Sequence, residues 1–76
     1  MTDLPARLDL RGLKCPLPAL IAKRAALRAP KGTLLEIFAD DPLAELDLTY
    51  MCEREGIAVL SSSRERGVFH MLIRRA

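Results

Sequence analysis

The hydrophobic pattern of the chain changes its period early, and this change limits the possible folds more than any other sequence feature. Ala6, Leu8 and Leu10 alternate with charged side chains, and this period of two predicts a strand with one buried face. From Leu17 to about Ala29 apolar residues recur at helical spacing, with basic residues between them, which predicts an amphipathic helix. The apolar residues of this expected helix include Leu20, Ile21, Ala25 and Leu27.

The next stretch repeats the order of strand and helix. Residues 33–39 are apolar apart from Glu36, which predicts a largely buried strand. A second helix is expected to begin at Asp41 and Pro42, because aspartate is a good N-cap and proline suits the first turn. Gly56 is expected to end this helix. Its expected buried stripe consists of Ala44, Leu48, Met51 and Cys52.

The remaining residues predict a β-hairpin. Residues 57–60 are apolar and predict a buried strand, whereas Phe69, Met71 and Ile73 alternate with other side chains in a final strand. Residues 61–67 contain a turn between them.

The expected order of elements is therefore β-α-β-α-β-β. A right-handed crossover through the first helix makes the first two strands parallel. With both helices on one face, the expected fold is α/β, a two-layer sandwich with a mixed four-stranded sheet. The chain of 76 residues is too short for a second hydrophobic core, so residues 1–76 are expected to form one domain.

Charge and hydropathy exclude several classes of function. A net charge of +2 is too small to indicate nucleic acid or an anionic membrane as a general partner. No apolar run approaches the roughly 20 residues that cross a bilayer, and residues 1–5 lack the features of a secretory signal. We therefore expect a cytoplasmic protein whose two cysteines are free thiols.

Cys15 is the candidate reactive residue, because it is expected close to the N-cap of the first helix. Unpaired N–H groups and the helix dipole stabilise a thiolate at such a position. Arg11 and Lys14 could add positive charge beside it. Pro16 suits the first helical position, and Pro18 is tolerated in the first turn. On spacing alone, Cys15 could also be an inert core or capping residue.

Residues 8–18, with the sequence Leu-Asp-Leu-Arg-Gly-Leu-Lys-Cys-Pro-Leu-Pro, resemble the Cys-Pro-x-Pro signature of TusA/SirA-like sulfur carriers. The Gly-Leu approach and the preceding strand also resemble this family. Asp40-Asp41-Pro42, Asp47 and Cys52 resemble its second sequence block. The resemblance spans nearly the whole chain and includes the expected order of elements.

The resemblance implies a sulfurtransferase-type carrier without a small-molecule pocket of its own. Cys15 would accept persulfide sulfur from a donor such as a cysteine desulfurase or rhodanese and pass it to an acceptor protein, with no cofactor apart from the covalent persulfide. Gly12, Pro16 and Pro18 would shape the motif, and Arg11 and Lys14 would assist docking. Family acceptors serve tRNA thiolation, molybdenum cofactor maturation or sulfur oxidation. Leu17 differs from the Cys-Pro-Glu-Pro form typical of tRNA-pathway carriers, which leaves the pathway open.

Two other functions remain open from the residues. Cys52 could resolve an oxidised Cys15 as a disulfide in a thiol redox protein, although its place on the buried stripe favours a core thiol. The protein could also be a noncatalytic regulatory binding module. His70, the only histidine, leaves too few ligands for a structural zinc site and is expected on the sheet surface. Asp9 and Asp47 are interpreted as residues of turns, caps or ion pairs.

Overall fold

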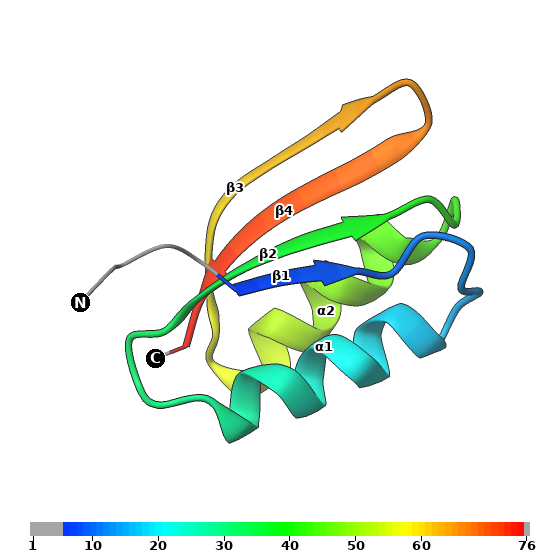
Figure 1. The fold of residues 1–76 in the computed structure, drawn as a ribbon. Coiled ribbons are helices and arrows are strands. Elements are labelled where there is room, and N and C mark those ends of the chain that lie inside the picture. Colours follow the sequence, from blue (N-terminus) through cyan, green and yellow to red (C-terminus); the bar gives the residue numbers. More distant parts are fainter. Residues whose placement is uncertain (1–5, 76) are drawn as a thin grey trace.

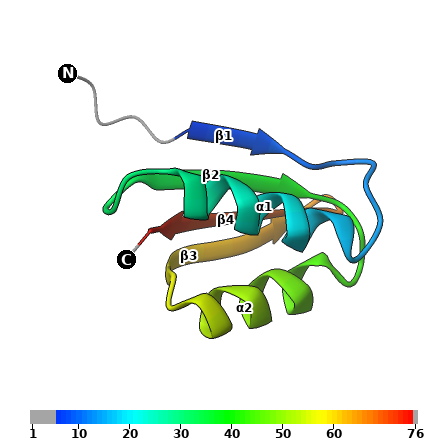
Figure 2. The ribbon, with the colours of Figure 1, turned by 90° about the horizontal axis from the view of Figure 1, so that it is seen from below.

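Four strands form a mixed sheet, and two helices cover one face of it (Figures 1 and 2). The computed structural model describes residues 6–75. Residues 1–5, to which the expected absence of a secretory signal refers, and residue 76 lie outside the described part. The elements are β1 (Ala6–Asp9), α1 (Leu17–Arg28), β2 (Leu34–Ala39), α2 (Ala44–Glu55), β3 (Ala58–Glu65) and β4 (Val68–Arg74).

The sheet has the strand order β1-β2-β4-β3. β1 is parallel to β2, as expected for two strands joined through a helix, whereas β4 is antiparallel to both β2 and β3. The predicted two-layer α/β sandwich is therefore confirmed. Because β1 and β2 are parallel, the loops that follow them leave the sheet at the same end, where the strands have their carboxyl termini.

The core lies between the sheet and the two helices. The predicted stripe of α2 is confirmed, since its four residues are all buried, and the alternating apolar residues of β4 are buried as predicted. β2 buries every second residue, and its other residues are partly buried. The largest fully buried side chains include Phe69, Ile37, Leu48, Met71 and Ile73.

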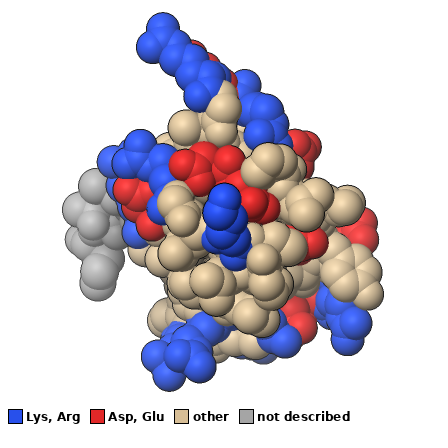
Figure 3. Space-filling model, turned by 90° about the vertical axis from the view of Figure 1, so that its right-hand side faces the viewer, with Lys and Arg blue, Asp and Glu red and all other residues tan. Residues whose placement is uncertain are grey.

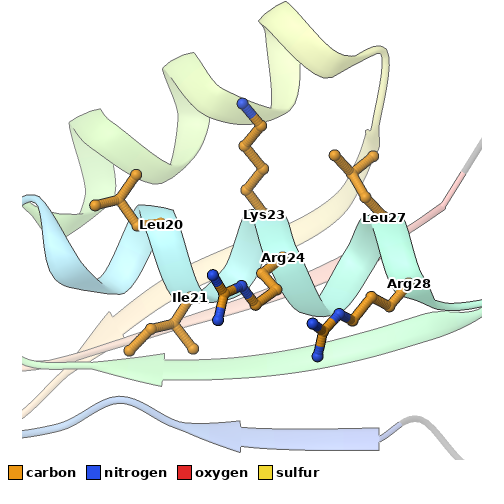
Figure 4. Close-up of a pocket in the computed structure, with 6 residues that line it drawn as sticks. All are labelled: Leu20, Ile21, Lys23, Arg24, Leu27 and Arg28. Atoms are coloured by element: carbon orange, nitrogen blue, oxygen red, sulfur yellow. The ribbon is translucent and has the colours of Figure 1, made fainter.

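The buried face of α1 differs from the apolar pattern that predicted this helix. Pro18, Ala22 and Ala26 are buried at intervals of four residues. These small or compact side chains let the helix lie close to the core. The larger apolar residues face outward, and they line a surface groove together with basic side chains (Figure 4). The groove residues are Leu20, Ile21, Lys23, Arg24, Leu27 and Arg28.

The predicted buried strand at residues 57–60 is wrong in its burial and its length. β3 runs from Ala58 to Glu65 and is exposed at every position, and only the preceding Ile57 is buried. The reason is that β3 is an edge strand of a long hairpin, visible in Figure 1. The hairpin turns at Arg66 and Gly67, which both have positive φ (53° and 80°), as two-residue hairpin turns of type I′ require.

Candidate functional site

The site lies where the β1–α1 loop meets the β2–α2 loop. The Leu10 N–H donates to the Phe38 carbonyl (2.7 Å), which continues the β1–β2 pairing into the first loop. The Gly12 N–H then donates to Asp40 Oδ1 (2.8 Å). Gly12 has a φ of +84°, which a glycine adopts without steric cost. These two hydrogen bonds hold residues 10–12, which lead to Cys15, against the end of β2 and the β2–α2 loop.

The prolines define the turn into α1, although the helix begins one residue later than predicted. Pro16 is the N-cap instead of the first helical residue, so Cys15 precedes the cap. The Leu17 N–H donates to the Lys14 carbonyl (2.8 Å), which closes a turn around the cysteine. Pro18 is fully buried and anchors this turn in the core. The Cys15–Pro16 peptide bond is cis.

Cys15 is partly buried, and its thiol donates a hydrogen bond to Asp47 Oδ2. Asp47 lies in the first turn of α2. The carboxylate favours the protonated thiol and, together with partial desolvation and the charge of Asp41, raises the pKa of Cys15 to about 11. The expected stabilisation of a thiolate by the helix N-terminus is therefore wrong for the unloaded site. The Asp47 carboxylate, which contacts the thiol, disfavours the thiolate, and α1 begins only at Leu17, beyond the cysteine.

Asp47 is the site residue whose role sequence reasoning missed. The sequence predicts a role for Asp47 in a turn, cap or ion pair, yet its carboxylate contacts the candidate nucleophile Cys15. Its neighbour Leu48 belongs to the buried stripe, and α1 and α2 pack together, so Asp47 stands at the border between the helices. One sequence signal pointed to Asp47, namely its place in the second block of the family resemblance.

The two basic residues expected near Cys15 have different surroundings. The Arg11 guanidinium binds both carboxylate oxygens of Asp9 (2.8 Å each), and this pairing lowers the pKa of Asp9 to about 2. Lys14 is exposed and lines a shallow pocket with Asp40 and Asp41. Figure 3 shows the end of the molecule that carries these loops, where acidic and basic side chains lie next to one another.

The start of α2, after the β2–α2 loop, also differs from the prediction. α2 begins at Ala44 with Leu43 as its N-cap, two residues beyond the predicted cap Asp41. Asp41 still organises this start, because its Oδ2 accepts a hydrogen bond from the Leu43 N–H (3.1 Å). The preceding aspartate, Asp40, binds Gly12 as described above.

Cys52 and His70 lie away from these loops in the roles expected of them. Cys52 is a free thiol and is 1% exposed, and burial raises its pKa to about 11. His70 Nε2 lies 2.9 Å from Glu36 Oε2 on the partly exposed positions of the sheet. Within residues 6–75 no group of histidine, cysteine and carboxylate side chains is arranged to hold a metal ion. In the same range no helix is long and apolar enough to cross a membrane.

Comparisons with known proteins find relatives over nearly the whole chain. The sequence profile of the family described as sulfurtransferase TusA matches residues 6–75. The sulfur carrier protein TusA of Allochromatium vinosum is 36% identical over 76 residues, which is the full length of both chains. A relative from Neisseria meningitidis serogroup A is 39% identical over 66 residues, covering 87% of this chain and 89% of its own.

A solved structure has the same fold. The crystal structure of a SirA-like protein from Desulfitobacterium hafniense superposes with a TM-score of 0.77 at 25% sequence identity. The similarity covers 91% of this chain and 95% of that one. From the profile match over nearly the whole sequence and the full-length relative, we conclude that this chain belongs to the TusA sulfurtransferase family.

Proposed function

We propose that the protein is a sulfur carrier that holds sulfur as a persulfide on Cys15. The observation that carries the proposal is the position of Cys15, a partly exposed free thiol held between two structured loops at one end of the molecule. The full-length relative named as a sulfur carrier supports the same reading.

The proposed reaction moves one sulfur atom between two proteins. Cys15 Sγ attacks the outer sulfur of a persulfide on the donor protein, so a new S–S bond forms as the donor S–S bond breaks. The donor leaves as a thiol after taking a proton. An acceptor thiolate or another nucleophile then attacks the outer sulfur on Cys15, which returns to its thiol form. Donor and carrier exchange sulfur at the same oxidation level, so this exchange needs no oxidant.

The proposed partners are those that the resemblance to the family implies. The donor is a protein that forms a persulfide, such as a cysteine desulfurase or a rhodanese. The acceptor is a protein in tRNA thiolation, molybdenum cofactor maturation or sulfur oxidation. Lys14 is exposed and is the basic residue available for docking beside Cys15, whereas Arg11 is held by Asp9 and shapes the loop.

The test is sulfur loading from a cysteine desulfurase and cysteine, followed by intact-mass measurement and peptide mapping. We expect one added sulfur atom on Cys15 in the wild type. Cys15→Ser should accept none while keeping the circular dichroism spectrum of the wild type, because this side chain lies outside the core. Cys52→Ala is the matched control and should still load. Failure of the wild type to load, with an established carrier loaded in parallel, would contradict the proposal.

A further inference from the structure

We infer that Asp47 distinguishes the unloaded carrier from the loaded one: it binds the neutral thiol of Cys15 and repels the persulfide anion. This inference rests on the proposed sulfur-carrier function. Asp47 thus lowers the reactivity of the unloaded thiol toward adventitious electrophiles, and it no longer holds the side chain once the persulfide has formed.

The contact between the two side chains supplies the first part of the argument. The Cys15 thiol donates to Asp47 Oδ2, which is possible only while the sulfur carries its proton. The carboxylate therefore holds the unloaded side chain in the neutral state and in one orientation. Both residues are partly buried, so solvent screens the interaction less than it would at a fully exposed site.

The charges around Cys15 supply the second part. From α2 the facing group is Asp47, and from the β2–α2 loop it is Asp41, whose charge also disfavours a thiolate. Lys14 precedes the cysteine in the chain and is exposed. Among residues 6–75 the ion pairs do not include Asp47, so no cation neutralises its carboxylate there. The immediate surroundings of the sulfur are therefore acidic.

Loading with sulfur changes the charge of the Cys15 side chain, and Asp47 then repels it instead of binding it. Hydropersulfides are more acidic than thiols, so the loaded side chain is an anion near neutral pH. It lacks the proton that the thiol donates to Asp47, and two like charges at contact distance repel. The persulfide therefore loses the contact with Asp47 that holds the unloaded thiol.

Asp47 also accepts the proton that the Cys15 thiol loses during loading. As Cys15 Sγ attacks the outer sulfur of the donor in its protonated form (R–S–SH), the Cys15 proton passes to the Asp47 carboxylate. The donor thiolate leaves as its S–S bond breaks, and it then takes the proton from Asp47. The new hydropersulfide on Cys15 releases its own proton to water, so atoms and charge balance and Asp47 returns to its anionic form.

The size of the effect follows from the pKa. Asp47→Asn keeps the shape of the side chain but removes the charge, so the pKa of Cys15 should fall from about 11 toward the ordinary value of 9.0. The thiolate fraction near pH 8 then rises by at most about 100-fold, because desolvation and Asp41 still act on the thiol, and a less basic thiolate is a weaker nucleophile, with a Brønsted coefficient of about 0.4–0.5. The net gain in reaction rate is at most on the order of tenfold.

The experiment measures alkylation of Cys15 by iodoacetamide near pH 8, with the modified peptide identified by mass. We expect unloaded Asp47→Asn to react up to about tenfold faster than wild type. After loading, the persulfides of the two proteins should be alkylated at rates within about twofold, because both are already anionic. Glu45→Gln is the matched control, since Glu45 lies in the same helical turn but pairs with Arg64 (3.1 Å), and it should leave both rates unchanged.

Three results would overturn the inference. One is equal alkylation of unloaded wild type and a folded Asp47→Asn variant. Another is an acceleration of the loaded form as large as that of the unloaded form. If Asp47→Asn does not fold, the pH profile of wild-type alkylation decides, and a midpoint at or below pH 9 would overturn it. A wild type that fails to load but shows the thiol effect would contradict only the carrier function.

Discussion

Replacing Cys52 by alanine should lower stability slightly and leave sulfur loading intact. Cys52 is 1% exposed on the buried face of α2, so the substitution removes one heavy atom from the core. Loss of a buried group of about methylene size costs about 0.8 kcal/mol, and the small cavity adds a few tenths. Alanine returns a few tenths through its higher helix propensity. The expected loss in the free energy of unfolding is therefore about 0.5–1 kcal/mol.

Thermal and denaturant unfolding followed by circular dichroism measure this loss, which should lower the midpoint temperature by about 2–8 °C in a domain of this size. Cys52→Ser is the informative comparison. Serine places a hydroxyl in the same apolar site, and an unpaired buried hydroxyl costs about 1–3 kcal/mol. We expect the serine variant to be the less stable of the two. Equal stability of both variants would show that the hydroxyl finds a hydrogen-bond partner, such as water, at the Cys52 position.

Loading of Cys52→Ala from a persulfide donor tests the redox alternative at the same time. A carrier that uses only Cys15 should load to the wild-type extent. The reasoning would be refuted by a folded Cys52→Ala variant that cannot turn over, together with a Cys15–Cys52 disulfide in the oxidised wild type. That pair of results would establish a thiol redox protein.

Three further predictions concern the thiols and the core. Native Cys15 should be alkylated faster than Cys52, because their pKa values are both raised to about 11 and only Cys15 is accessible; equal rates in peptide mapping would contradict this. Since folding raises these pKa values above 9.0, the stability they contribute is present below pH 9 and lost as the pH rises toward 11, so the midpoint temperature should fall in this window, and by less in Cys52→Ala. Leu48→Ala, at a position with 0% exposure, should cost about 2–5 kcal/mol in denaturant unfolding, and a cost below 1 kcal/mol would contradict the core assignment.

The fold could be predicted because several sequence patterns pointed to the same arrangement. The alternation in β4 and the stripe of α2 each fit one period, and both are buried as predicted. α1 misled because it carries apolar residues on more than one side, and alanine contributes little to a hydrophobic pattern although it packs closely. The exposure of β3 could not be predicted, because an apolar run does not reveal whether a strand lies at the edge of its sheet.

The place of Cys15 in the fold was predictable, but the electrostatics around it were not. Cys15 stands between a strand signal and two prolines, and these local features place it at a loop end. The partner that decides its pKa is Asp47, which lies 32 positions further along the chain. Local sequence does not show which side of one helix meets the start of another. A shift of one residue at the N-cap also removed Cys15 from the position at which the helix end would favour a thiolate.

The close packing of α1 through Pro18, Ala22 and Ala26 has a consequence for how such a chain can diverge. Because these residues bury the helix, the larger side chains Leu20 and Leu27 contribute little to the core. Substitutions there can alter the outer surface at small cost in stability, as is usual for exposed positions. The side chains of α1 that hold the fold together are thus different from those that form its outer surface. Descendants of this chain can acquire a new exterior while the loops around Cys15 keep their geometry.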